Sequence, residues 1–178
     1  MKKKILALAS MAAMLAFGNE AQAVDNVASS DAKATIASGI TCAKDISGLT
    51  GGDLAFGIII PSASAIDVVS INANTGVRSH STSATMVNST YGPAAFNVTG
   101  AAGASYTITL PTGSTLISNG AQTMEVKNFS AYGNGASGAY IIASNATASF
   151  KVGADLHVAV NQATGVYSGP FQVTVAYQ

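Results

Sequence analysis

The side chains that most often carry catalysis are few and widely separated in this sequence. It contains two histidines, His80 and His157, and one cysteine, Cys42. Nucleophilic catalysis needs a serine or cysteine beside a base, and a third group that orients the base. His157 stands between Leu156 and Val158 in an alternating segment, so we expect it on a solvated face, and His80 lies in a polar loop or edge. The sequence therefore predicts no nucleophilic active site.

The carboxylates form neither an acid pair nor a metal-binding array. They are isolated along the chain at Asp45, Asp53, Asp67, Glu125 and Asp155. A metal site needs three or four converging ligands, and a calcium loop needs a regular array of oxygen donors. The glycines at 51–52 and 100–103 lack the lysine and the following helix that a phosphate loop requires, so they are predicted as turns. We expect no enzymatic activity, no metal and no cofactor.

Two other features could serve contacts with other molecules. Cys42 has no partner for an intramolecular disulfide, so it is either a small buried apolar residue or the site of an intermolecular disulfide. The glycine-rich segment 132–138 is predicted as a flexible loop. Its Tyr132 and Asn134 could contact a ligand such as a glycan, whereas the alternative is that the tyrosine covers an edge of the core.

The N-terminus predicts export. Lys2 to Lys4 precede an apolar run over residues 5–17, and Ala21-Gln22-Ala23 has the small-x-small pattern of a cleavage site. The apolar run is shorter than the roughly 20 residues that a membrane-spanning helix needs. We therefore expect a signal peptide over 1–23, a flexible tail over 24–32 and one domain over 33–178. The mature protein would lie in the periplasm, at the cell surface or outside the cell, without a membrane span.

The charge balance argues against nucleic acid as a partner. The chain has 8 basic and 8 acidic residues, and cleavage after residue 23 would remove three lysines and one glutamate, which leaves 5 and 7 and a net charge of −2. The remaining basic residues are scattered singly, so no patch could neutralise a row of phosphates. Only 9% of the residues are charged, which is well below the usual quarter and is more typical of an exterior scaffold than of a cytosolic enzyme.

The spacing of apolar residues predicts an all-β domain. Segments rich in Val, Ile, Thr, Tyr and Phe alternate with Gly, Asn, Ser and Pro clusters, and no helical period of 3.6 follows the leader. The predicted strands cover residues 35–41, 54–60, 66–71, 95–99, 105–110, 123–129, 146–152, 155–160 and 171–177. The nearly continuous apolar segment 54–60 is expected in the centre of a sheet, with a bulge or close approach at Gly57. Such strands predict a two-sheet antiparallel, immunoglobulin-like (pilin-like) β-sandwich.

Several segments together resemble an exported bacterial family known as domain of unknown function 4402. They are residues 54–61, 96–111, 126–129, 152–156 and 161–175. This resemblance covers nearly the whole expected mature chain and implies no activity and no catalytic residues. The order of an early cysteine strand, a Leu-x-Phe-Gly strand and a final Gly-x-Tyr-x-Gly-x-Phe-x-Val-x-Val strand is also similar to spore coat protein U domains, which occur in chaperone–usher pili.

That second resemblance implies assembly by strand addition, in which one subunit accepts an extended segment of its neighbour. We therefore expect a non-enzymatic structural protein, a cell-surface or fimbria-like subunit whose partners are copies of itself or other surface subunits. The alternative is a secreted glycan-binding or adhesive module that uses Tyr132 and Asn134.

Overall fold

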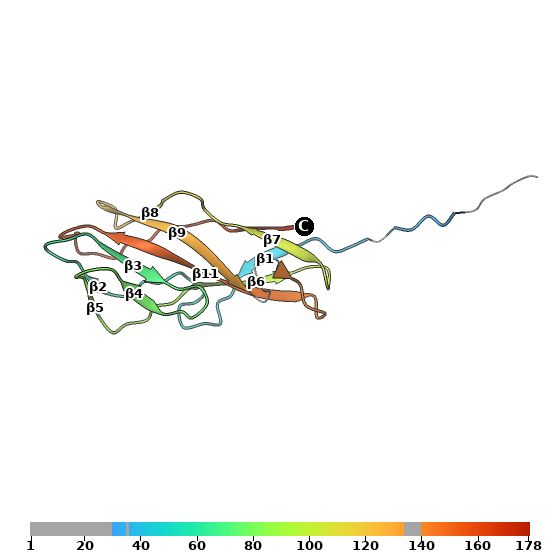
Figure 1. Ribbon diagram of the computed structural model, residues 1–178, viewed down its shortest axis with the longest axis horizontal. Coiled ribbons are helices and arrows are strands. Elements are labelled where there is room, and N and C mark those ends of the chain that lie inside the picture. Colours follow the sequence, from blue (N-terminus) through green and yellow to red (C-terminus); the bar gives the residue numbers. More distant parts are fainter. Residues whose placement is uncertain (1–29, 35, 134–139) are drawn as a thin grey trace, which may run out of the picture. The chain divides into compact units, whose positions relative to one another are not determined.

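Every regular element of the described chain is a β-strand. The computed structural model describes residues 30–34, 36–133 and 140–178 (Figure 1). Residues 36–178 form one compact unit, and all the strands belong to it. The strands are β1 (Thr41–Lys44), β2 (Ile59–Ile60), β3 (Asp67–Ile71), β4 (Arg78–His80), β5 (Thr85–Met86), β6 (Ala94–Thr99), β7 (Ser105–Thr109), β8 (Thr115–Ser118), β9 (Thr123–Gly133), β10 (Tyr140–Ile141), β11 (Thr147–Val158) and β12 (Thr174–Tyr177). No helix among these residues could cross a membrane.

Strand β11 organises the largest sheet, which has seven strands. One edge of β11 pairs with β6 and then with β3, while the other edge pairs with β9 over most of its length. Strands β1, β4 and β8 extend the sheet beside β6, β3 and β9, and every pairing is antiparallel. Alternate side chains of β11 from Phe150 to Val158 are buried. Because burial alternates along β11, one face of this strand faces the core and the other faces outward.

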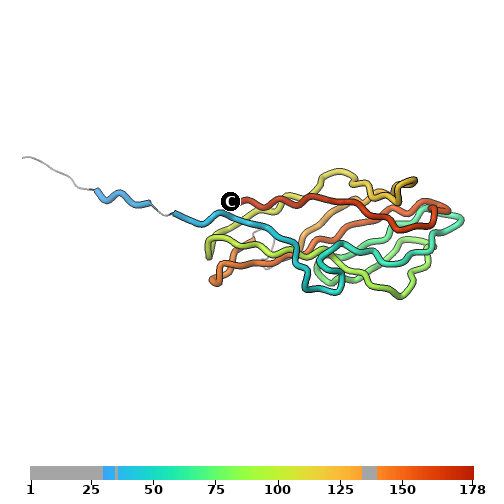
Figure 2. Tube along the Cα trace, turned by 180° about the vertical axis from the view of Figure 1, so that it is seen from behind, coloured from blue at the N-terminus to red at the C-terminus, as the bar shows by residue number. Residues whose placement is uncertain are grey.

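A three-stranded sheet, β10-β7-β12, covers part of that buried face. The two sheets meet in cluster B, whose buried members are Ala94, Val98, Tyr106, Ile142, Phe150 and Val152. The other part of the face carries cluster A, formed by Phe56, Val69, Ile71, Met124, Val126, Ala154, Leu156 and Val158. Figure 2 shows the last strand running along the side of the domain beside the segment that leads into β1. This packing confirms an all-β antiparallel architecture and fits a β-sandwich.

The predicted central strand over residues 54–60 is wrong. Only Ile59–Ile60 forms a strand, paired with the two residues of β5, and Ala55 makes an isolated bridge to Gly92. Ile58 and Ile60 are 56% and 52% exposed. The physical reason is Gly57, whose φ of +74° interrupts the extended chain.

The expected close approach at Gly57 is confirmed. A Cβ atom at this position would lie 2.5 Å from Nη1 of Arg78 and 2.6 Å from Oγ of Ser89. Glycine is therefore required here both by the backbone conformation and by the lack of space.

Other strand predictions hold with shifted boundaries. The segments predicted at 66–71, 95–99 and 105–110 are confirmed as β3, β6 and β7. The strands predicted at 146–152 and 155–160 join into the single strand β11, and the first strand begins at Thr41 instead of residue 35. Strands β4, β5, β8 and β10 were not predicted, because two to four residues carry too little alternation to be recognised.

Candidate functional site

The sequence singled out two histidines, one cysteine and two glycine turns, and all of them lie in the described part of the chain. No group of three or more His, Cys, Asp or Glu side chains in this part of the chain could hold a metal ion. Cys42 is a free cysteine. His80 lies on the edge strand β4, as expected, and His157 lies on the face of β11 opposite to the buried Leu156 and Val158. The glycines at 51–52 and at 100–103 lie at turns, as predicted.

Asp67 is a buried carboxylate whose environment the sequence analysis missed. Its side chain is fully buried at the start of β3. Oδ1 accepts hydrogen bonds from the N–H groups of Ser81 and Thr82 and from Oγ of Ser81, and Oδ2 accepts one from the N–H of Ala84 at 2.6 Å. Nδ1 of His80 lies 3.4 Å from Oδ2. The carboxylate therefore anchors the loop after β4 and is not free to react.

The pKa of Asp67 follows from this environment. Burial by itself raises the pKa of a carboxyl group, but here the hydrogen bonds from Ala84, Ser81 and Thr82 outweigh burial and lower it well below its ordinary value. The alternation of β3 was a usable signal, since residue 67 shares its face with the buried Val69 and Ile71.

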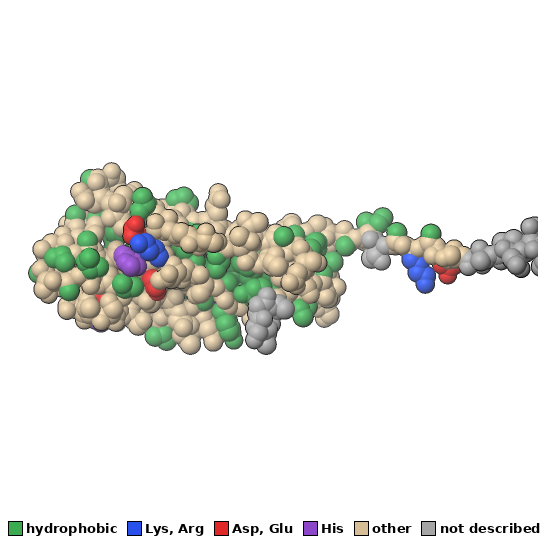
Figure 3. Space-filling view, turned by 45° about the horizontal axis from the view of Figure 1, so that its top comes forward, with side chains coloured by type: hydrophobic (Ala, Val, Ile, Leu, Met, Phe, Trp, Pro, Cys, Tyr) green, Lys and Arg blue, Asp and Glu red, His purple; other side chains and the backbone are tan. Residues whose placement is uncertain are grey.

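A cluster of charged and polar side chains lies on the outer face of the large sheet. Glu125 on β9 is the cross-strand partner of His157, and Lys127 is the partner of Asp155. Nζ of Lys127 lies 2.6 Å from Oε2 of Glu125, and this hydrogen bond is the main reason why the pKa of Glu125 is lowered. Figure 3 shows acidic, basic and histidine side chains gathered in one place on a mostly uncharged surface. The ion pair between Lys127 and Glu125 is exposed, so it contributes little to stability.

The predicted contact residues lie in a different setting from the one expected. Tyr132 is the penultimate residue of β9 and 50% exposed, so it belongs to a strand and not to a loop. Asn134 lies outside the described residues. Cys42 lies on β1, partly buried against cluster B, and burial raises the pKa of its thiol. The expectation that it packs as a small apolar residue agrees with this position, whereas the intermolecular disulfide stays a prediction.

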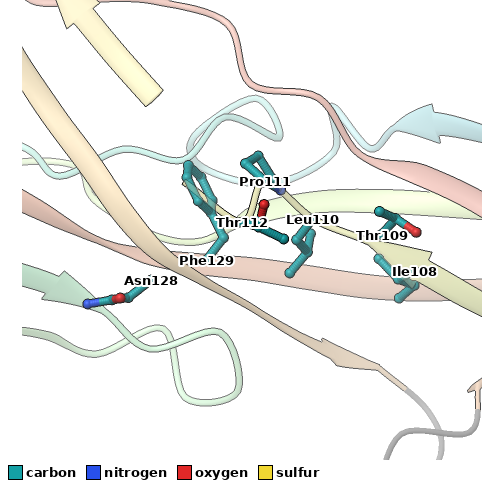
Figure 4. Close-up of a pocket in the computed structure, with 7 residues that line it drawn as sticks. All are labelled: Ile108, Thr109, Leu110, Pro111, Thr112, Asn128 and Phe129. Atoms are coloured by element: carbon teal, nitrogen blue, oxygen red, sulfur yellow. The ribbon is translucent and has the colours of Figure 1, made fainter. Parts of the chain in front are cut away.

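One side of the sandwich is open between β7 and β9. A shallow hollow there is lined by Ile108, Thr109, Leu110, Pro111, Thr112, Asn128 and Phe129 (Figure 4). In Figure 4 Ile108 and Leu110 point to the same side of β7, Phe129 lies close to Pro111, and Asn128 points away from the hollow. Ile108, Leu110 and Phe129 are only partly buried against cluster B. The core is therefore incompletely covered on this side.

The last strand, β12, is the edge of the three-stranded sheet. Among the described residues β12 pairs only with β7. Val175 of β12, and Phe171 and Val173 just before it, are partly buried against cluster B. The N–H of Gln178 donates to the carbonyl of Ser105 at 3.0 Å. Hydrogen-bonded and non-hydrogen-bonded pairs alternate along an antiparallel ladder, so the backbone groups of Val175 and Tyr177 point away from β7. No other strand among the described residues pairs with these groups, so this side of β12 is a free edge.

Tyr177 ties the segment before β1 to the end of this edge. Its hydroxyl donates to the carbonyl of Ser38 and accepts from the N–H of Ala101, both at 2.7 Å. A Cβ atom at Gly100 would lie 2.6 Å from that hydroxyl. The first and last described parts of the domain therefore meet at one end of β12.

A comparison with known protein families assigns most of the chain to one family. The family model described as Domain of unknown function (DUF4402) matches residues 46–177. The chain belongs to this family. The matched region of DUF4402 contains β2 to β12 and leaves β1 outside. No curated protein and no solved structure matches the chain. The resemblance to DUF4402 noted from the sequence is thus confirmed, and the family description assigns no activity.

Proposed function

We propose that this DUF4402 protein is an exported, non-enzymatic structural subunit of a cell-surface or fimbria-like assembly. It associates with a second copy of itself, or with a related subunit, by strand addition to β12. The proposal includes a signal peptide over residues 1–23 that is cleaved after residue 23 on export, and an immunoglobulin-like arrangement of the sandwich. The similarity to spore coat protein U domains supports the same role.

The free edge of β12 is the observation that carries this proposal. Residues 171–178 contain no charged residue and no proline, and the side chains of Val173 and Val175 are only partly buried. Natural proteins usually protect such edges with lysine, proline or a bulge, because an unpaired edge is a template for another strand. An added strand would satisfy the backbone groups of Val175 and Tyr177 and would cover the apolar side chains beneath them.

The segment before β1 has the properties of the added strand. Residues 30–34 and 36–39 are exposed, and the side chain of Ile36 is 98% exposed. Ala32, Ala34 and Ile36 alternate with Lys33 and Thr35, which gives one small apolar face and one polar face. Such a strand could pair with the edge of β12 without deep pockets, because the side chains of Ala32 and Ala34 are small.

A proline substitution tests the edge. Val175→Pro removes an N–H group that points away from β7, whereas Val175→Ala shortens the same side chain and keeps the N–H. We expect the wild type and Val175→Ala to associate, measured by size-exclusion chromatography with light scattering, and Val175→Pro to remain monomeric. Thermal melting of both variants checks that the domain still folds.

Deletion of residues 24–34 and the accessibility of Cys42 provide independent readouts. Without residues 24–34, which include part of the donor segment, the protein should no longer associate. The partly buried Cys42 thiol should also react faster with maleimide in the monomer than in the assembly. A wild-type protein that stays monomeric at high concentration, with its association and stability unchanged by the deletion, would rule out strand addition.

A further inference from the structure

A bulge in β9 determines which of its side chains face solvent. Ser130 pairs with Gly153 and Lys127 pairs with Asp155, so Asn128 and Phe129 together lie opposite one residue of β11. Asn128 has a φ of +53°, a left-handed conformation that asparagine tolerates better than most residues. Its Nδ2 donates to Oδ2 of Asp155 at 2.8 Å. The side chain therefore holds the bulge in place.

The bulge turns Tyr132 outward. Val126 is buried before the bulge, and Phe129 and Ala131 face the core after it. With regular alternation from Val126, residue 132 would point to the core instead. Tyr132 is 50% exposed on the outer face, directly opposite Lys151 of β11. Bulges that re-aim a side chain are common beside functional sites.

The sheet around Tyr132 presents hydroxyl and amide groups in register. Asn97 and Ser149 are cross-strand partners, and both are exposed on the same face as Lys151. One row further along, three exposed threonines are aligned across three strands: Thr41, Thr99 and Thr147. Cross-strand neighbours are about 5 Å apart. Of these positions only Lys151 carries a charge.

We propose that this face binds a neutral polysaccharide, with a sugar ring stacked on Tyr132 and its hydroxyl groups bonded to Ser149, Asn97 and the threonine row. A tyrosine ring offers an apolar surface for the C–H face of a sugar, while hydroxyl and amide side chains both donate and accept hydrogen bonds. An exposed sheet face suits an extended polymer better than a small ligand, which would need a concave pocket. The scarcity of charge makes an anionic partner a poor match.

This site goes beyond the assembly role and does not depend on it. It lies on the outer face of β9, β11, β6 and β1, whereas strand addition uses the edge of β12. The expectation of glycan contact at Tyr132 is kept, but the contact surface is a strand face and not the predicted loop.

Polysaccharide binding by the purified exported protein tests the proposal. The probes are dextran and laminarin in affinity electrophoresis, and insoluble cellulose and chitin in pull-down assays. We expect saturable binding to at least one of the four, a loss of at least about tenfold in Tyr132→Ala, and less than a twofold change in Tyr132→Phe, because stacking needs the ring and not the hydroxyl. Ile141→Ala is the matched control, since Ile141 is also 50% exposed but lies on the other sheet.

Ser149→Lys provides a second variant, in which a long charged side chain disturbs the face without removing the tyrosine. It should also lose binding, and thermal melting should show that each variant is folded. Failure to bind any of the four polysaccharides, or equal binding by the wild type, Tyr132→Ala and Ser149→Lys, would overturn the proposal. The oligomeric state measured in parallel separates this outcome from a failure of strand addition.

Discussion

Asp67 is the charged side chain that the described part of the chain buries completely. A buried carboxylate is tolerated only when hydrogen bonds replace its lost hydration, and here backbone N–H groups of residues 81, 82 and 84 do so. Sequence alternation alone could have placed Asp67 in the core beside Val69. The donors could not be predicted, because they come from a loop that only the folded chain brings to this position.

Asp67→Asn should lower the free energy of unfolding by about 2–3 kcal/mol at neutral pH. The asparagine keeps one acceptor oxygen but turns a donor toward the N–H of Ala84 or toward the N–H groups of Ser81 and Thr82. Urea denaturation measures the difference. Asp53→Asn is the control, because Asp53 is exposed and pairs only with Lys44 at 2.8 Å; its effect should stay within about 0.5 kcal/mol.

The effect of Asp67 should depend on pH with a defined sign. The pKa of this carboxyl is lower in the folded protein than in the unfolded chain, so its contribution is complete above the unfolded value of about 4. It is lost as the pH falls below that value toward the folded pKa. The gap in stability between wild type and Asp67→Asn should therefore be constant from about pH 7 to pH 5 and shrink below about pH 4. A gap that grows on acidification would contradict the assignment.

Arg78 joins two segments that have little strand structure of their own. Nη1 donates to the carbonyl of Phe56 and Nη2 to that of Val87, both at 2.8 Å, and the guanidinium lies 4.4 Å from the ring centre of Tyr91. Arg78→Lys keeps the charge but replaces the planar guanidinium, whose two Nη atoms donate to different carbonyls, by a single ammonium group. We expect a loss of about 1–3 kcal/mol in urea denaturation, against a near-neutral Lys151→Arg control on the exposed face.

At the scale of the elements, long alternating strands could be predicted and irregular ones could not. The alternation of β3, β6 and β7 is directly visible in the sequence. Segment 54–60 is almost entirely apolar, and an apolar run alone does not reveal that Gly57 turns the chain. The end of β9 was also missed, because the bulge at Asn128 shifts the alternation by one residue and the continuation to Gly133 then resembles a loop.

Asn128 gives a prediction for this bulge. Asn128→Gly keeps the left-handed backbone and loses only the exposed hydrogen bond to Asp155, so it should cost less than about 1 kcal/mol. Asn128→Val places a β-branched residue in that conformation and should cost about 2 kcal/mol or more. Thermal melting compares the two variants. Equal stability would mean that the positive φ at Asn128 does not matter to the fold.

At the scale of the whole domain, two hydrophobic clusters share one sheet. Leu54 and Phe129 pack against both cluster A and cluster B, and β11 contributes buried residues to each. No single segment of the sequence contains a cluster, which is why the sequence could predict a shared interior but not its division into two parts. Because the clusters share residues and a central strand, residues 36–178 should unfold as one cooperative unit.

Leu54→Ala tests this cooperativity. We expect the free energy of unfolding to fall by about 1–3 kcal/mol, less than for a fully buried leucine, because Leu54 is only partly buried. The urea transition should stay single, with coincident curves from far-ultraviolet circular dichroism, which follows all strands, and from tyrosine fluorescence, which includes the buried Tyr106 of cluster B. Leu116→Ala, at a residue 56% exposed on β8, is the control and should change stability by less than about 0.5 kcal/mol. A single shifted transition in Leu54→Ala would support one shared core. Two separated transitions would mean that the two clusters fold independently and that Leu54 only bridges them.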